Sequence, residues 1–220
     1  MNTNIVLIDI CGTLYDSNTT FDFLDFYIKK RSYIFFRKFS RMLILRLLNK
    51  ILILLFKLDL TRIIAVRFLK DKTTKELKSA VDLFYLNYLI NLKQTKIINI
   101  VNQLKLDGKT MILVSATLDF IAKKISEEVK IESFVSTTLH YKDNICLGTI
   151  KSDLLFNKLE ILKSKSIDPP YFLTITDNIS DLDILFHSNN RIVVSKKRNE
   201  KKWLKKLEFY NILNCKIISD

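Results

Sequence analysis

The sequence predicts an α/β protein: a parallel β-sheet between two layers of helices, with an all-helical insertion after the first strand. Three observations support this. In the second half of the chain, short apolar runs alternate with segments of helical periodicity, a pattern typical of parallel strands joined by right-handed crossovers. One further apolar run opens the chain, and a long segment without glycine or proline follows it. The 220 residues are sufficient for one domain with a substantial insertion.

The first predicted strand lies in IVLIDICGTLYD, residues 5–16. Its apolar residues lead into a tight turn that contains Gly12. Asp9 ends the strand, and the carboxyl ends of parallel strands are where α/β proteins place their sites. Cys11 follows two residues later, so the stretch presents a carboxylate and a thiol at the same end of the sheet.

Residues 17–96 form the predicted insertion. Phe21 to Lys70 contains no glycine or proline, and Leu, Ile and Phe recur at spacings of three and four, as in a helix. Between Lys29 and Lys70 there are twelve basic residues and one acidic residue, so this segment carries +11 of the net charge of +13. On a helical wheel Arg46, Lys50 and Lys57 fall within about 40° of one another. The insertion is therefore both strongly basic and strongly apolar.

Two interpretations of this insertion remain open. It is either a helical cap packed on its own core with solvated basic residues, or an amphipathic surface that meets anionic lipid or a lipid-linked substrate. Its longest uninterrupted apolar run, ILILLF, is far short of the roughly 20 residues that cross a bilayer. Nucleic acid is not an expected partner, because no nucleic-acid-binding motif accompanies the charge.

After the insertion the predicted elements follow in order. A strand is predicted over 110–116, a helix over 118–130 and a strand over 132–141. Residues 143–148 are predicted to form a turn, after which the chain runs back along that strand. A helix is predicted over 152–163 with Ser152 as its N-cap, and then a buried strand over 171–176. A helix starts at 180–186, a strand covers 191–195, and a last helix covers 199–209.

Polar residues at the ends of these strands are the candidate site. The first strand contributes Asp9 and Thr13, the second Ser115 and Thr117, and the fourth Asp177 and Asp181, with Lys158 on the intervening helix. Each has an ordinary structural interpretation as a turn residue, a helix cap or a surface charge. Together they supply a nucleophilic carboxylate, hydroxyl donors, a cation and carboxylates able to hold Mg²⁺, which phosphoryl transfer requires.

Four motifs in the chain resemble those of the haloacid dehalogenase (HAD) superfamily, and within it the phosphoserine-phosphatase-like branch with a helical cap after the first strand. They are DICGTL, ILVSATLDFIAKKI, LGTIKSDLLFNKLEIL and ITDNISDLDIL. Lys158 is assigned as the lysine of the third motif, with Lys151 as the alternative. The resemblance covers nearly the whole chain. It implies a Rossmann-like three-layer core from residues 1–16 and 97–220, and a cap from residues 17–96.

The resemblance also implies a role for each residue of the site. Asp9 is expected to attack phosphorus and form an aspartyl-phosphate. Mg²⁺ is the expected cofactor, held by Asp9, the backbone carbonyl of Cys11, Asp177 and, directly or through water, Asp181.

The phosphoryl oxygens are expected to contact three other residues. These are Thr13, Ser115 and Lys158, of which Lys158 also offsets the charge of the nucleophile. The basic cap is expected to close over this site and to select the substrate.

Cys11 departs from the family pattern, because the phosphatases have at this position an Asp that protonates the leaving oxygen. A thiol with a reference pKa of about 8.5 is a weak general acid. Two classes of function therefore stay open. One is a Mg²⁺-dependent phosphohydrolase or phosphotransferase that acts on an anionic small-molecule, sugar-linked or lipid-linked phosphate. The other is a HAD-fold binding protein with little turnover. A haloacid dehalogenase is a lesser alternative, because halide leaves without protonation.

The cysteines and the N-terminus indicate the compartment. Three scattered cysteines without a CxxC pair predict neither a disulfide framework nor a zinc site. The chain passes from MNTN directly into the first strand, so no signal peptide is expected. We expect a cytoplasmic protein that contacts the membrane, if at all, through the basic cap.

Overall fold

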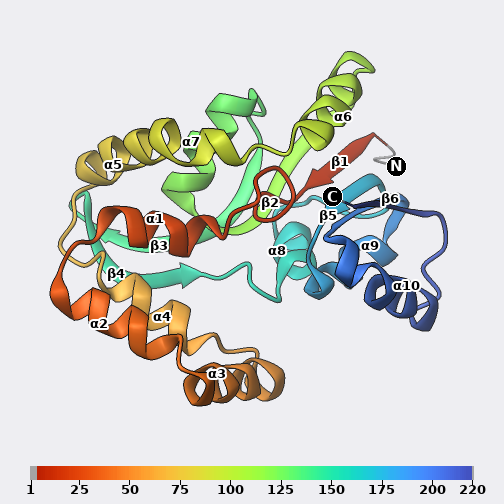
Figure 1. Cartoon of the computed structure of the whole chain (residues 1–220). Helices are drawn as coiled ribbons and strands as arrows, with labels where there is room; N and C mark the ends of the chain where they lie inside the picture. The colour runs from red at the N-terminus through yellow and green to blue at the C-terminus, as the bar shows by residue number, and fades with distance from the viewer. Residues whose placement is uncertain (1–3, 220) are drawn as a thin grey trace.

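The computed structural model describes residues 4–219 and shows a seven-stranded sheet with helices on both faces (Figure 1). The strand order is β4-β3-β2-β1-β5-β6-β7. The strands are β1 (Ile5–Ile8), β2 (Thr110–Leu118), β3 (Phe134–Lys142), β4 (Ile145–Ser152), β5 (Tyr171–Thr176), β6 (Ser188–Ser195) and β7 (Cys215–Ser219). β4 pairs antiparallel with β3, and the other neighbours pair in parallel. The predicted α/β class with a largely parallel sheet is confirmed.

The alternating directions of the side chains along β1 explain why the sheet lies between two layers of helices. Successive residues of a strand point to opposite faces of the sheet. Val6 and Ile8 belong to one apolar cluster, whereas Ile5 and Leu7 belong to a second cluster on the other face. A third cluster packs helix α10 (Glu200–Phe209) against β6 through Trp203. Both faces of the central strand are therefore buried, as its continuous apolar run predicts.

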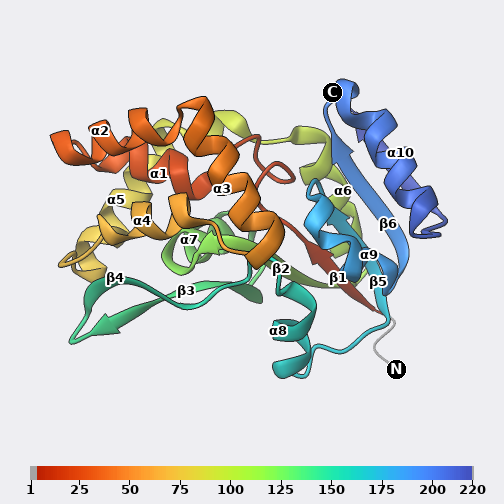
Figure 2. The ribbon, with the colours of Figure 1, turned by 90° about the horizontal axis from the view of Figure 1, so that it is seen from below.

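The insertion between β1 and β2 is helical. It contains α1 (Thr19–Tyr27), α2 (Arg31–Ser40), α3 (Leu43–Phe56), α4 (Leu60–Arg67), α5 (Thr74–Asn87) and the 3₁₀ helix η1 (Leu89–Leu92), and α6 (Thr95–Leu106) then leads into β2. Figure 2 shows α2, α3 and α4 on the side of the molecule that carries β3 and β4. Residues of α1, α4 and α5 share one buried apolar cluster with β1 and β2. Helix α1 contacts β2, α4 contacts β4, and α5 packs against α1 and α7.

The remaining helices lie between the later strands. They are α7 (Asp119–Val129), α8 (Lys158–Ser164), η2 (Ile179–Asp181), α9 (Leu182–Phe186), η3 (Lys197–Asn199) and α10. The predicted helix over 118–130 and the last helix are confirmed. The final strand β7 was not predicted, although it pairs in parallel with β6 along its whole length.

The predicted helix over 152–163 was wrong in its first half. Ser152 is the last residue of β4 rather than an N-cap, and α8 begins only at Lys158. Two tertiary features explain the delay. Asp153 is held by an ion pair with Arg62 from the insertion, and Phe156 has a positive φ of 67° that a helix does not allow.

Candidate active site

Three neighbouring strands bring the central residues of the site together. Asp9 follows β1 and donates its backbone N–H to the carbonyl of Ile175 in β5, 2.9 Å away. Ser115 lies within β2, because that strand continues to Leu118; it is therefore not a helix cap. Asp177 directly follows β5. The predicted strand-end residues thus converge at one edge of the sheet, as parallel strands require.

Lys158 is the cation beside the predicted nucleophile. Its Nζ lies 3.2 Å from Asp9 Oδ2 and 2.6 Å from Asp181 Oδ2, and all three side chains are buried. Thr176 Oγ1 also donates to Asp181 Oδ2, at 2.6 Å. Burial alone would lower the pKa of Lys158, but Asp181 and Asp9 outweigh it and raise that pKa. Lys158 is therefore charged, whereas Lys151 is exposed on β4.

The carboxylates outnumber the cation. Burial raises the pKa of Asp9, and Asp181 raises it further, although Lys158 opposes both effects. Burial also raises the pKa of Asp177 to about 8, with further contributions from Asp9 and Asp181. Three carboxylates around one lysine leave an excess of negative charge that a divalent cation would neutralise.

The Asp177 carboxylate rests against the turn after β1. A Cβ on Gly12 would lie 2.0 Å from Asp177 Oδ2, and the φ of Gly12 is +66°. Glycine is therefore required here for two independent reasons. Thr13 Oγ1 donates a long hydrogen bond of 3.5 Å to Asp177 Oδ1. The Asp177 carboxylate is thus placed directly beside the backbone that follows Asp9.

The carboxylates of this site fit Mg²⁺ only if backbone and water oxygens supply the remaining ligands. Within residues 4–219 no group of three or more His, Cys, Asp and Glu side chains is arranged to hold a metal ion. Mg²⁺ is bound in proteins by one or two carboxylates and keeps several waters. Asp9 and Asp177 could supply those carboxylates, the carbonyl of Cys11 could supply a third oxygen, and Asp181 already accepts hydrogen bonds from Lys158 and Thr176.

Cys11 lies in a cluster of hydroxyl groups. Its Sγ is 3.0 Å from Thr19 Oγ1 and 3.1 Å from Thr117 Oγ1, and these two hydroxyls are 2.8 Å apart. Ser115 Oγ is 3.0 Å from Thr117 Oγ1. Burial raises the pKa of the Cys11 thiol, and the charge of Asp9 raises it further. The thiol is therefore protonated at neutral pH, and it cannot take a proton from water.

Sequence reasoning missed Thr19 and Arg62. Thr19 begins the first inserted helix, and no motif distinguishes it from other residues near a helix start. Arg62 was counted only as one of the basic residues of the insertion. It is buried and donates to Asp153, to the carbonyl of Ala116 and to Thr137. Arg62 therefore ties helix α4 to β2, to β3 and to the segment that follows β4.

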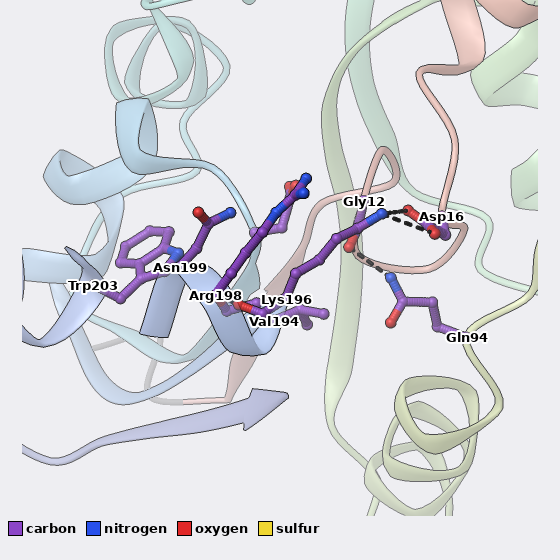
Figure 3. Close-up of a pocket in the computed structure, with 10 residues that line it drawn as sticks. Gly12, Asp16, Gln94, Val194, Lys196, Arg198, Asn199 and Trp203 are labelled. Atoms are coloured by element: carbon purple, nitrogen blue, oxygen red, sulfur yellow. Dashed lines mark hydrogen bonds and ion pairs between the residues drawn. The ribbon is translucent and has the colours of Figure 1, made fainter. Parts of the chain in front are cut away.

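A pocket of ≈ 390 Å³ opens beside Gly12 and Asp177. Figure 3 shows Lys196, Arg198 and Asn199 on the segment that follows β6, facing Gln94 across the pocket. Gln94 Nε2 donates to the carbonyl of Gly12 at 2.7 Å, and Lys196 pairs with Asp16 at 3.3 Å. One signal in the sequence could have pointed to this pocket: the basic run KKR, residues 196–198, directly follows a predicted strand.

Comparison with known proteins identifies the family. A family model described as haloacid dehalogenase-like hydrolase matches residues 6–185. The chain therefore belongs to the haloacid dehalogenase-like hydrolases. A comparison with curated protein sequences gives no match.

Solved structures resemble the fold along almost the whole chain. A protein of unknown function from Bordetella pertussis Tohama I is similar with a TM-score of 0.69 and 16% identity over 97% of each chain. A phosphoserine phosphatase with an analogue of the phospho-aspartyl intermediate has a TM-score of 0.59 and 16% identity over 98% of this chain and 94% of that chain. Cytosolic 5′-nucleotidase IIIB bound to cytidine has a TM-score of 0.65 and 11% identity over 99% and 81%. The fold is thus that of the phosphoserine-phosphatase-like branch, as the motifs predicted.

Proposed function

We propose that the protein is a Mg²⁺-dependent phosphohydrolase or phosphotransferase that forms an aspartyl-phosphate on Asp9. The observation that carries the proposal is the contact between Asp9 and Lys158 within a cluster that also holds Asp177 and Asp181. In a hydrolase family, a buried carboxylate oriented by a lysine at the end of the central strand is suited to nucleophilic attack.

The chain's own residues account for the first step. One oxygen of Asp9 accepts the backbone N–H of Ile10 at 2.7 Å, and the other lies near Lys158. A carboxylate oxygen attacks phosphorus, and the bond from phosphorus to the leaving oxygen breaks. The leaving group departs with the electron pair of that bond, and a basic leaving oxygen takes its proton from solvent, because the Cys11 thiol is a weak acid. Lys158, Ser115 and Thr13 offer donors to the phosphoryl oxygens. Mg²⁺, when bound, would neutralise charge on the transferred group.

The second step depends on a base for water. Water attacks phosphorus, the bond to Asp9 breaks, and inorganic phosphate leaves. The protonated thiol of Cys11 cannot act as this base. The same thiol is a weak acid for the first step, so the favoured substrates are those whose leaving group departs without protonation, such as another phosphate.

The same observation on Cys11 favours a second candidate function. A protein that binds Mg²⁺ and a phosphorylated ligand but turns over slowly would keep Asp9, Lys158 and Asp177 without a general acid. It is distinguished from an enzyme by turnover, not by ligand binding.

The pocket beside Asp177 supports an anionic substrate. Arg198 is exposed on its wall, and Lys196 lies nearby. A guanidinium at this position suits a second phosphate or carboxylate of the substrate. We propose a phosphorylated small-molecule, sugar-linked or lipid-linked substrate.

We further propose that residues 17–96 act as the cap on a core of residues 1–16 and 97–220. Helices α1, α4 and α5 share one buried apolar cluster with a face of the sheet, and Arg62 ties α4 to Asp153. Within the described part of the chain, no helix is long and apolar enough to cross a membrane. A cytoplasmic protein with peripheral membrane contact fits this organisation.

The test is turnover of a panel of alkyl phosphates, aryl phosphates, acyl phosphates and pyrophosphates, with and without EDTA. We expect Mg²⁺-dependent release of phosphate that Asp9→Asn abolishes. Metal-independent activity that survives Asp9→Asn would refute the proposal. Binding of a beryllium fluoride mimic without turnover of any substrate would favour the binding protein, and release of halide from a 2-haloacid would favour a dehalogenase.

A further inference from the structure

Helix α3 (Leu43–Phe56) has an unusual exposure for so apolar a helix. It has 14 residues, none of which is buried. Leu43 is 81% exposed and Leu54 is 80% exposed. An exposed contiguous apolar surface of this kind marks an interaction site rather than an ordinary solvated face.

The helix presents two opposite apolar faces. Its inner face holds the half-buried residues Leu45, Asn49, Leu52 and Ile53. On a wheel of about 100° per residue the opposite face spans about 140°. We call this the outer face of α3; it consists of Leu43, Ile44, Leu47, Leu48, Ile51, Leu54 and Leu55, all of them exposed.

The attachment of α3 to the rest of the insertion leaves the outer face free. Asn49 Nδ2 donates to Asp59 Oδ1 at 3.0 Å, and Asn49 Oδ1 accepts the backbone N–H of Thr61 at 3.1 Å. These contacts fix the helix to the start of α4 by its inner face. Figure 2 shows α3 beside α2 and α4, at the margin of the inserted helices.

Helix α2 extends the apolar surface. Phe39 of α2 and Leu48 of α3 line the same apolar groove of ≈ 390 Å³ between α2, α3 and α4. Phe35, one helical turn before Phe39, is 71% exposed and stacks against it with ring centroids 6.1 Å apart. Exposed aromatic and aliphatic side chains therefore continue from the outer face of α3 onto α2.

Basic residues flank this surface. Arg46 and Lys50 are exposed on α3, one helical turn apart. Lys57 ends the helix with a φ of 53°, so it is not on the helical wheel as predicted, but it is exposed at the same end. Not every cation of the insertion is free: Arg62 is buried with Asp153, and Arg37 and Arg41 pair with Asp25. Among the described residues Arg46, Lys50 and Lys57 form no ion pair, so α3 carries unpaired positive charge beside its outer face.

We infer that the outer face of α3 docks on the surface of an anionic lipid bilayer. A helix with an apolar face and flanking Lys and Arg lies in the plane of the membrane interface, with its apolar side chains below the headgroups. The cations beside it attract anionic lipid, by about 1 kcal/mol for each Lys or Arg near the surface. No residue of the candidate active site takes part, so the inference stands independently of the proposed function.

A second copy of the chain is the main competing occupant. An isologous contact through α3 would place two copies of Arg46, Lys50 and Lys57 against each other, within two segments that each carry +11. Such like charges oppose association at low salt, whereas an anionic bilayer complements them. The charge therefore selects the lipid surface.

Co-sedimentation of the full chain with lipid vesicles tests the inference. We use phosphatidylcholine vesicles with about one third phosphatidylglycerol, and vesicles of phosphatidylcholine alone as the comparison. We expect binding to the anionic vesicles at low salt and release of most of the protein at about 0.5 M salt, where screening is strong. Absence of binding to the anionic vesicles overturns the inference.

Matched variants locate the contact. Leu54→Glu should reduce vesicle binding at least about tenfold, because it places a charge among the apolar side chains. Leu106→Glu is the control, because Leu106 is 82% exposed and also lies in the last turn of its helix, α6. Equal binding of the two variants overturns the inference. Circular dichroism melting checks their folding, and Leu43→Glu replaces Leu54→Glu if the latter does not fold.

Reversing the charge of two basic residues on α3 provides a second, independent variant. Arg46→Glu with Lys50→Glu should abolish binding at low salt. The control is Lys201→Glu with Lys205→Glu, which reverses an exposed pair of the same spacing on α10. Loss of binding in both double variants would mean that net charge alone drives adsorption and would overturn the inference. A concentration-dependent dimer in sedimentation that Leu54→Glu dissociates, without vesicle binding, would assign the face to a second copy instead.

Discussion

Cys11→Asp should restore a general acid to the site. The hydroxyls of Thr19 and Thr117 lie 3.0 Å and 3.1 Å from the Cys11 sulfur, so a carboxyl group placed there has two partners that hold its orientation. The site also contains Asp9, Asp177 and Asp181 beside a single lysine. Their charge and the burial of the position would raise the pKa of a new carboxyl group, which keeps it protonated and able to donate.

The expected gain is about 10²-fold in kcat/KM for alkyl phosphates, the low end of general-acid effects. This corresponds to about 2.7 kcal/mol of transition-state stabilisation. We choose the low end because the same carboxylates that keep the acid protonated also reduce the fraction of its ionised form, which is the form that activates water in the second step. Acyl phosphates and pyrophosphates should gain much less, because their leaving groups depart without protonation.

The assay compares kcat/KM of wild type, Cys11→Asp and Cys11→Asn on one alkyl phosphate and one acyl phosphate. The Asn variant is similar in shape but carries no acid, so it should resemble the wild type. An equal gain for both variants would show that shape, not proton donation, limits the reaction. A loss with Cys11→Asp on every substrate would refute the reasoning and would assign a function to the thiol itself.

Three further predictions follow from particular contacts. Gly12→Ala should abolish Mg²⁺-dependent activity, because its Cβ would lie 2.0 Å from Asp177 Oδ2; Gly108→Ala, with a similar φ of +70° and no atom within 4 Å, should lose only about 1 kcal/mol of stability and keep activity. Arg62→Met should lower the free energy of unfolding by about 3 kcal/mol in urea titrations, whereas the exposed Arg67→Met should change it little; similar losses would refute a special role for the buried ion pair. Burial would raise the pKa of Asp25, but hydrogen bonds from Arg37 and Tyr33 outweigh it and lower that pKa. The resulting stability is fully present above the ordinary Asp pKa of about 3.9 and is lost as the pH falls through the lower folded value. Asp25→Asn should therefore destabilise the protein near neutral pH and flatten the acid limb of its stability curve; an unchanged limb would contradict this assignment.

The sequence by itself determined the order of the sheet-forming segments up to β6 and the residues at their ends. Strand β5 and helix α7 were predicted almost to their boundaries, because apolar run length and helical periodicity are local properties. Asp9, Ser115 and Asp177 could be selected because the carboxyl ends of parallel strands meet at one edge. The lysine was assigned by resemblance, and its contact with Asp9 agrees with that choice.

The tertiary structure alone decided which groups meet across long sequence separations. Arg62 and Asp153 are 91 residues apart in the chain, and their ion pair delays the start of α8. Thr117 and Cys11 are 106 residues apart, and they meet because β2 pairs with β1. Neither contact leaves a periodic signal, since each depends on how separate elements pack.

The exposure of the outer face of α3 could also not be predicted from the sequence. Its apolar residues fit a buried cap helix and an interfacial helix equally well, because a hydrophobic pattern records which side chains avoid water but not what covers them. The structure shows that α2 and α4 cover the inner face and leave every residue of the outer face exposed, although Leu48 and Ile51 also line the groove beside α2. Burial is a property of the packed molecule, so the outer face of α3 became visible as a docking surface only when the surrounding helices were in place.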